Sequence, residues 1–564
     1  MMMKRTEPDI IEIKAEELQE TLQHAETAMS EKDYERIKAV FEAYAYVTDE
    51  LGKKRVAVGR LQKLLFGAKT EKTEAVVGAG TDADSSASSG EEPPAESTQE
   101  TDPESKASKK RKGHGRNGAD AYDGAEKIPV PHPSLEAGDD CPDCQTGTVY
   151  NMAQPRSLVR LVGQAPVKAT VFQLQRLRCG LCGKVFTAPL PDGVGAQKYD
   201  ATTGSIIGVL KYGSGMPFNR LEGLQGSFGI PLPASTQWDI VADVFLHIEP
   251  AVIELSRQAA QGDVLYNDDT VTKILDLMGK RAKKNASAKT EQDDSTDEVD
   301  PSRTGLFTSC IVSTQDGRRI ALFFSGRRHA GENLAKVLAE RAEALAPPIQ
   351  MCDALSRNLP GELETIVANC LAHGRRRFAD VSELFPDECK HVLLALKVIY
   401  KNDEDARKQK LSPEERLKLH QAESRSTMDD LHSWLNRQLD ERLVEPNSAL
   451  GEAITYMLKH WTKLTLFLRK AGAPLDNNIC ERALKKAILH RKNSMFFKSK
   501  KGARTGDAFM SLIYTCELNG TNPFDYLTEL QRHAKELAAA PHNWMPWNYR
   551  ATLAAITTPS VPVC

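Results

Sequence analysis

The spacing of apolar residues near the N-terminus predicts a long helix. Between Ile10 and about Lys72, apolar side chains recur alternately four and three positions apart, at Val40, Tyr44, Val47, Leu51, Val58, Leu61 and Leu65. This heptad spacing is typical of a coiled-coil seam and favours self-association of two chains. A helical hairpin that packs on itself would produce the same pattern.

The apolar periodicity disappears between Thr73 and Asp120, where Ser, Ala, Glu, Pro and Thr predominate. Such a segment buries too little apolar surface to fold, so we expect a disordered linker. Its far end is basic and could follow a phosphate backbone, although a solvated tail would have the same composition. The basic residues are Lys109, Lys110, Arg111, Lys112 and Arg116.

A helical pattern returns between Tyr199 and about Gln258. Within it, Asn219–Ser227 and Pro233–Phe245 flank a short turn and share an apolar seam. This arrangement resembles a helix-turn-helix that contacts DNA. Many helical hairpins without a DNA partner have the same pattern.

From Asp263 onward the pattern predicts short strands and then helices. The expected strands are Val264–Asn267, Lys273–Leu277, Leu306–Ser313, Arg319–Phe324 and Ile349–Cys352, with a helix near Gly331–Ala344. The charged stretch 279–303 is interpreted as a hairpin insertion. Ser382 to about Lys470 is predicted to be almost wholly helical, and a further helix is expected at Ile479–Leu489.

Composition and charge narrow the class of protein. The chain has 564 residues, 40% hydrophobic and 27% charged, as in soluble proteins of several domains. It shows no signal peptide and no apolar run of the about 20 residues that span a bilayer, so a cytoplasmic, nucleoid-associated location is expected. The net charge of −3 conceals an acidic stretch, Asp82–Glu104, that precedes the basic end of the linker.

Two CxxC pairs predict a structural zinc site. Cys141 and Cys144 form the first pair, and Cys179 and Cys182 form the second. Four thiolates satisfy tetrahedral Zn²⁺ without an open position. The flanking segments suggest strands, hence a zinc ribbon, for which DNA is the expected partner. A redox role for one pair is the alternative.

Three carboxylates are candidates for phosphodiester chemistry. Asp268 and Asp353 each follow a predicted strand, and Glu481 lies near the start of a downstream helix. In-line displacement at phosphorus uses two Mg²⁺ ions held by carboxylates, and an RNase H-like sheet would bring such residues together. Mn²⁺ would serve in vitro.

Each carboxylate also has a simpler interpretation. An aspartate at a strand end is commonly a turn residue, and the neighbouring Asp269 could take the place of Asp268. Glu481 could complete a capping box with Asn478. Nearby basic residues could hold the DNA backbone or line a solvated helix face; they are His373, Arg375, Arg376, Arg482, Lys485, Arg491 and Lys492.

The segment DNNICERALKKAILHRKN, beginning at Asp476, resembles the C-terminal signature of the insertion sequence 66 (IS66) family of transposases. NDDT at 267–270, ANCLAHGRRRF at 368–378, LKYGSGMPFNR at 210–220, LQKLLFGAKTEK at 61–72 and WMPWNYR at 544–550 resemble other family segments, in the same order. The CxxC pairs match its zinc-binding domain. Ala354-Leu355 departs from the usual Gly-Tyr after the second aspartate, Asp269 replaces a glutamate, and His490 stands where glycine is common.

The resemblance implies a DDE transposase with Asp268, Asp353 and Glu481 as the catalytic triad. Its expected partners are the terminal inverted repeats of an element, target DNA, a second copy of the chain through the N-terminal helix, and accessory proteins encoded by the element. No membrane partner is expected. A catalytically retired DNA-binding protein and a general metal-dependent nuclease are the alternatives.

The expected fold is multidomain α+β, with an RNase H-like α/β core interrupted by a helical insertion. The predicted parts are a coiled-coil segment at 1–72, a linker at 73–128, a zinc ribbon at 129–191, a helical segment at 192–258, the first part of the core at 259–381, a helical insertion at 382–470, the second part of the core with Glu481 at 471–534, and a tail at 535–564.

Overall fold

The computed structural model describes residues 128–152, 164–178, 184–195, 197–279 and 303–557, together with six positions between 30 and 39. The coiled-coil prediction therefore lies almost wholly outside the described residues. The linker with its basic residues Lys109–Arg116, the pair Cys179 and Cys182, and nearly all of the 279–303 insertion also lie outside them.

The chain divides into two compact units, Asp82–Lys168 and the remainder (Met1–Thr81 with Ala169–Cys564). The smaller unit contains a tight turn around Cys141, closed by an isolated bridge between Asp140 and Thr148. The larger unit contains a two-stranded antiparallel hairpin, β1 (Arg176–Arg178) with β2 (Val185–Thr187), and a five-stranded sheet.

The five-stranded sheet has the order β5-β4-β3-β6-β7 and is mixed. Strand β3 at its centre pairs antiparallel with β4 and parallel with β6. The pair β4–β5 is antiparallel, and β6–β7 is parallel. The strands are β3 (Val264–Val271), β4 (Phe307–Gln315), β5 (Arg318–Gly326), β6 (Ile349–Cys352) and β7 (Ile366–Asn369).

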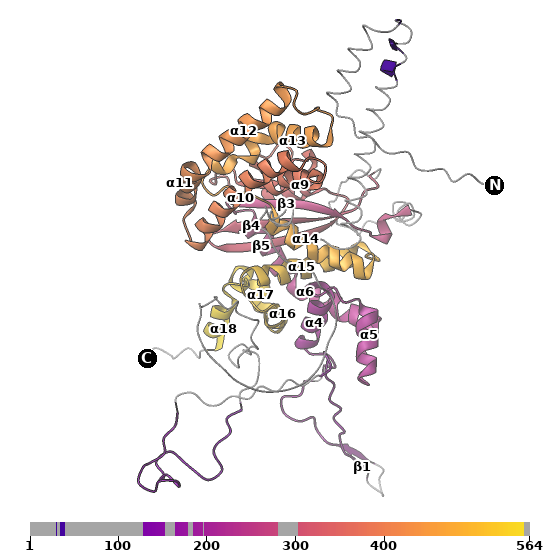
Figure 1. Cartoon of the computed structure of the whole chain (residues 1–564). Helices are drawn as coiled ribbons and strands as arrows, with labels where there is room; N and C mark the ends of the chain where they lie inside the picture. Colours follow the sequence, from indigo (N-terminus) through magenta and orange to yellow (C-terminus); the bar gives the residue numbers. More distant parts are fainter. Residues whose placement is uncertain are drawn as a thin grey trace, which may run out of the picture. The chain divides into compact units, whose positions relative to one another are not determined.

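Helices α9 to α13 gather beyond the β3 side of the sheet, away from β5 (Figure 1), and α13 contacts β7. Their apolar faces enclose one core with the β6–β7 side of the sheet, around Met351, Ala368, Leu393 and Met457. The helical stretch predicted from 382 to 470 is confirmed. The helices are α9 (Leu371–Val381), α10 (Pro386–Lys408), α11 (Pro413–Glu423), α12 (Arg425–Asp440) and α13 (Ala449–Leu464), followed by the short η5 (Leu466–Leu468).

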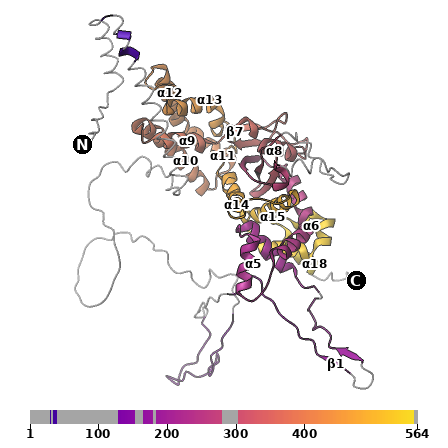
Figure 2. The same ribbon diagram turned by 90° about the vertical axis from the view of Figure 1, so that its right-hand side faces the viewer.

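In a second group of helices, α14 packs across β3 and β4, while α15 covers β5 and runs beside α6 (Figures 1 and 2). Trp544, in the stretch expected to be a tail, is buried, and that stretch packs against α6. The helices are α4 (Ala201–Gly208), η2 (Val209–Gly213, a π-helix), α5 (Phe218–Ser227), α6 (Ala234–Ala259), α14 (Asn478–Ser494), α15 (Lys500–Leu518), α16 (Pro523–Arg532), α17 (Ala534–Ala539), η6 (Pro541–Trp544) and α18 (Tyr549–Thr557).

Helix α15 covers the outer edge of β5 with polar side chains. The backbone N–H groups of Ala321, Phe323 and Ser325 donate in turn to Thr515 Oγ1 (3.0 Å), Ser511 Oγ (2.9 Å) and an Asp507 carboxylate oxygen (2.6 Å). An uncovered strand edge would invite pairing with another chain. The side chains of α15 therefore accept the backbone hydrogen bonds that a sixth strand would otherwise accept.

Two strand predictions were wrong. Strand β3 does not end at Asn267 but continues to Val271, because the longer β4 offers a partner to every residue as far as Phe307. Lys273–Leu277 is not a strand, since β4 begins opposite Val271. There Ile274 forms a single bridge with Phe497, and a 3-10 turn, η3 (Leu275–Leu277), follows. Helix α8 (Ala330–Leu338) is also shorter than predicted.

The helical hairpin α5–α6 forms where the sequence predicted it. Gln237 is buried and its amide donates to Phe218 O (3.0 Å) and to Leu232 O (2.8 Å), which fixes the turn between the helices. Helix α6 continues past Phe245, the end of the helix-turn-helix-like portion, and through Pro250; it ends at Ala259, close to the predicted end of the helical region at about Gln258.

Candidate active site

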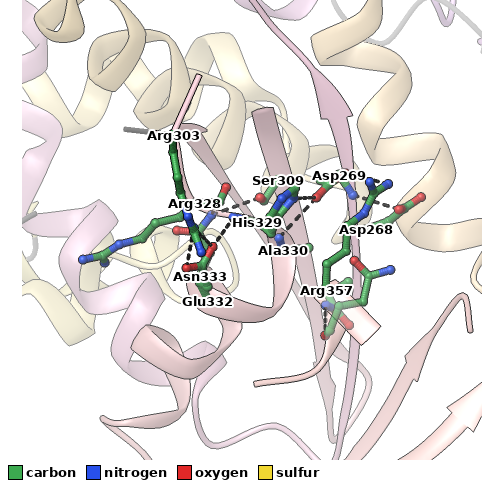
Figure 3. Close-up of polar contacts among 12 residues, drawn as sticks. Asp268, Asp269, Arg303, Ser309, Arg328, His329, Ala330, Glu332, Asn333 and Arg357 are labelled. Atoms are coloured by element: carbon green, nitrogen blue, oxygen red, sulfur yellow. Dashed lines mark hydrogen bonds and ion pairs between the residues drawn. The ribbon is translucent and has the colours of Figure 1, made fainter. Parts of the chain in front are cut away.

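Asp268 and Asp269 lie in the middle of β3 and point to opposite faces, because side chains alternate along a strand. The Asp269 side chain is only 2% exposed. Its carboxylate lies 2.9 Å from His329 Nδ1 and 3.4 Å from the Arg357 guanidinium, and it accepts a hydrogen bond from the Ala330 N–H at 3.4 Å. Figure 3 shows this cluster, with Asp268 turned away from His329. Asp269 is thus engaged in a structural ion-pair cluster at the start of α8.

Asp353 directly follows β6, which lies beside β3 in parallel register. The Asn358 side-chain amide donates to Asp353 Oδ1, and the Leu355 backbone N–H donates to the same oxygen at 3.3 Å. Asn358 is buried in the short turn η4 (Ser356–Asn358). The loop after β6 therefore holds the Asp353 carboxylate in one orientation.

Glu481 lies in the first turn of α14, which packs across β3 and β4. Asn477 fixes the start of this helix: its side-chain amide donates to Asn267 O (3.2 Å), and its backbone N–H donates to Cys370 Sγ (3.2 Å). The capping-box interpretation of Asn478 is not realised, because Asn478 is the first helical residue and donates to Asp476 (3.1 and 2.7 Å).

The environment of Asp268 disfavours its charged form. Burial is the main reason that the pKa of Asp268 is raised to about 7; the charges of Asp353, Asp269 and Glu481 contribute to the rise, and the Asp269 backbone N–H opposes it. Burial also raises the pKa of Asp476, again with Glu481 contributing. A partly buried group of carboxylates of this kind is stabilised by a bound cation, and hard carboxylate oxygens are the ligands that Mg²⁺ prefers. The donor set therefore fits a divalent metal.

His373 and Cys370 lie next to Glu481. His373 Nδ1 is 3.8 Å from Glu481 Oε1, and one ligand atom from each of the three residues lies within 4.8 Å of the others. The sequence predicted His373 as a DNA contact and did not predict a role for Cys370. Both belong to the ANCLAHGRRRF segment, whose Cys-x-Ala-His spacing was the available signal. Burial raises the pKa of Cys370 to about 12, so its thiol stays protonated.

The other predicted DNA contacts lie in different environments. Arg491 donates to Thr270 Oγ1 (3.2 Å) and to Val271 O, which ties the end of α14 to β3. Arg482, Lys485 and Lys492 are exposed on α14, and Arg376 is exposed on α9, whereas Arg375 is half-buried. The exposed side chains remain predicted DNA contacts.

In the smaller unit, Cys141 and Cys144 share one turn in which the Gln145 N–H donates to Cys141 O (2.8 Å). Hydrogen bonds from the Thr146 backbone and side chain and from Gly147 lower the pKa of Cys144 to about 6, with Cys141 contributing. An exposed thiol that ionises readily suits metal binding. Since Cys179 and Cys182 lie outside the described residues, the four-cysteine zinc site stays a prediction.

No helix in the part of the chain that the structure describes is long and apolar enough to cross a membrane.

Comparison with known proteins places the chain among transposases. A model of the family described as "Transposase IS66 family" matches residues 198–505, which is more than half of the chain. The chain belongs to this family, as its resemblance in the DNN-ER segment predicted.

Similar proteins occur in Sinorhizobium fredii (strain NBRC 101917 / NGR234). "Uncharacterized protein y4jD" is 27% identical over 419 residues, covering 72% of this chain and 78% of that protein. "Uncharacterized protein y4hP" is 26% identical over 412 residues, covering 68% of each. "Uncharacterized protein y4qI" is 26% identical over 361 residues, covering 61% of this chain and 62% of that protein.

Proposed function

We propose that this transposase cuts the ends of its insertion sequence and joins the freed strands to target DNA, with Asp268, Asp353 and Glu481 as its metal ligands. The observation that carries the proposal is the register of the sheet: β6 pairs in parallel with β3 so that Met351 lies opposite Tyr266, and Asp353 and Asp268 each follow two residues later. The sheet order β5-β4-β3-β6-β7, with an antiparallel half and a parallel half, supports an RNase H-like core.

The proposed reaction has two displacements at phosphorus. Water attacks the phosphodiester at the element end and breaks the P–O3′ bond, which leaves a 3′-OH and a 5′-phosphate. The 3′-OH then attacks a phosphodiester of target DNA, forming one P–O bond while the target strand's own 3′ oxygen leaves. Two Mg²⁺ ions bound by the carboxylates would activate the attacking oxygen and stabilise the leaving oxygen.

The protein's own residues orient the metal ligands and the DNA. Strand β3 and the end of β6 hold two carboxylates on a rigid sheet, and Asn358 fixes the rotation of Asp353. Helix α14 begins next to β3, where Asn477 donates to Asn267 O, and would supply Glu481 as the third ligand from a distant part of the sequence. The exposed Arg482, Lys485 and Lys492 would bind the DNA backbone, while a zinc ribbon and a coiled-coil dimer would hold two element ends together.

The decisive experiment measures strand cleavage and joining on a labelled duplex that carries the inverted repeat flanking the gene. The wild type and Glu481→Gln are compared in Mg²⁺ and in Mn²⁺, with Glu452→Gln, an exposed acid on α13, as the matched control. Activity in the wild type and the control, with none in Glu481→Gln despite normal DNA binding, is expected. Equal activity in Glu481→Gln would overturn the triad.

A further inference from the structure

A pocket of about 360 Å³ opens beside Asp353. This volume lies in the range of about 300–1,000 Å³ that is usual for small-molecule sites. A DNA duplex, whose major groove alone is about 12 Å wide, is too large to enter it. The walls come from the loop after β6, from α9 and from α13; they are Asp353, Ala354, Leu355, His373, Arg376, Arg377, Asp380 and Tyr456.

One wall of the pocket is a stacked pair of planar groups. The Arg377 guanidinium lies over the Tyr456 ring, 4.0 Å from its centroid, and the ring also contacts His460, with centroids 4.9 Å apart. Guanidinium planes and aromatic rings are the surfaces on which proteins stack unpaired bases. The apolar side chains of Ala354 and Leu355 complete a lining that suits a flat, partly apolar ligand.

Close helix packing holds this wall in place. At Gly374 of α9 an added Cβ would lie only 2.5 Å from Met457 Sδ of α13, so the two helices approach as closely as a glycine permits. Met457 is fully buried and adjoins Tyr456 in the sequence. Arg377 on α9 and Tyr456 on α13 therefore face each other across a closely packed helix contact.

The charges around the pocket indicate which ligand it suits. His373, Arg376 and Arg377 supply three basic groups against the one acid, Asp380, on the same helix, whereas Asp353 joins the pocket to the carboxylates proposed to hold metal. A ligand with a flat base and a phosphate would match both features. A phosphate at the Asp353 end would lie where the reacting phosphodiester must lie.

We propose that this pocket binds a single unpaired nucleotide of the DNA strand that is cut, with its base against Arg377 and Tyr456 and its phosphate beside Asp353. The inference rests on the proposed function, and it adds that the DNA must be locally unpaired to reach the metal site. It assigns to the helical insertion, through α13, a direct part in binding the substrate.

The test uses two duplexes of the inverted-repeat sequence, one fully paired and one with a single unpaired 2-aminopurine next to the cleavage position, with Ca²⁺ in place of Mg²⁺. We expect the wild type to bind the second duplex about tenfold more tightly, because the base can stack on the Arg377 guanidinium, whose other face lies against the Tyr456 ring. The fluorescence of 2-aminopurine should fall as the base stacks.

Arg377→Ala and Tyr456→Leu should lose this preference while binding the paired duplex as the wild type does. Tyr456→Phe retains the ring, and Arg437→Ala removes an exposed cation from α12, outside the pocket, so both should keep the preference. Equal affinity of the wild type for the two duplexes, or a preference that survives Arg377→Ala, would overturn the inference.

The outcomes also separate this inference from the proposed function. A wild type that cuts the paired element end but shows no preference for the unpaired base refutes the pocket alone. A wild type that binds neither duplex refutes both. Displacement of the unpaired base by free deoxyadenosine monophosphate, with the affinity for the paired duplex unchanged, would assign the pocket to a free nucleotide instead.

Discussion

The Asp507 carboxylate accepts two hydrogen bonds from Ser325, one from the backbone N–H at 2.6 Å and one from the hydroxyl at 2.7 Å. Ser325 belongs to the edge strand β5, and Asp507 is the first of the side chains on α15 that cover this edge. Because the two residues are 182 positions apart in the chain, the contact joins the two halves of the core on either side of the helical insertion.

Removal of this carboxylate should destabilise the core. Asp507→Ala leaves the Ser325 backbone N–H without its acceptor in a half-buried site, whereas the Ser325 hydroxyl still has Thr308 Oγ1 at 2.7 Å. The loss should be about 1–3 kcal/mol, the usual cost of one unsatisfied group. Urea unfolding followed by circular dichroism measures the loss. Asp525→Ala removes an exposed acid from α16 and serves as the control. A similar change in both variants would contradict the importance of the Ser325 contact.

The same carboxylate should make stability depend on pH. Burial raises the pKa of Asp507 to about 7, whereas an aspartate in the unfolded chain titrates near about 3.9. Between these values the folded protein retains a proton that the unfolded chain has released, so stability falls as pH rises through this window and is constant above it.

Comparison of the wild type with Asp507→Asn isolates this effect, because asparagine does not titrate. The free energy of unfolding of the wild type, relative to the variant, should decrease as pH rises from about 5 to 7 and then level off. A difference that stays constant across this range would show that Asp507 ionises normally in the folded protein.

The neighbours Asp268 and Asp269 should respond oppositely to the same substitution. Asp268→Asn relieves the repulsion between Asp268 and its neighbouring carboxylates. Without metal, the melting temperature should therefore rise by about 2–4 °C, which is the shift that about 1 kcal/mol of stabilisation gives in a larger domain. Asp268→Asn should also abolish the stabilisation by Mg²⁺ and abolish strand cleavage. Asp269→Asn should lower the melting temperature, because His329 and Arg357 lose their anion, yet retain the Mg²⁺ effect.

Thermal melting with and without Mg²⁺ distinguishes the two aspartates directly. Should Asp269→Asn lose the Mg²⁺ response and Asp268→Asn keep it, the first triad position would have to move by one residue.

Asn358 should act through the orientation of Asp353. Asn358→Ala removes the amide that donates to Asp353 Oδ1, and the Mg²⁺ concentration for half-maximal cleavage should rise about tenfold or more, as for other residues that orient a metal ligand. DNA affinity without metal should not change. Asn447→Ala, on an exposed turn, is the control. An unaltered Mg²⁺ requirement in Asn358→Ala would mean that the orientation of Asp353 does not depend on Asn358.

The cysteine pairs should hold one Zn²⁺ per chain. Metal analysis of the purified protein should find this ion, and Cys144→Ser should lose it, because three thiolates bind Zn²⁺ more weakly than four. Cys564→Ser, which alters a cysteine outside either pair, should keep the ion. Zinc retained in Cys144→Ser at full stoichiometry would exclude this cysteine as a ligand.

Several features were available from the sequence because they depend on near neighbours in the chain. The 3.6-residue spacing of apolar side chains predicted the helices between 386 and 468, and the apolar run Ile349–Cys352 predicted a strand that ends just before Asp353. The motif around Glu481 identified the family. In each case the signal lies within one helix, one strand or one short motif.

The tertiary structure decided what the sequence left open. Asp268 and Asp269 are equivalent in the sequence, and only their place in a paired strand sends one toward Glu481 and the other toward His329. In the sequence Arg491 is equivalent to its basic neighbours, and only the structure shows that it donates a hydrogen bond to Thr270 of β3. The sequence determined which elements form, because their spacing is local. The structure alone decided which side chains meet, because those contacts join residues that only the packed sheet and helices bring together.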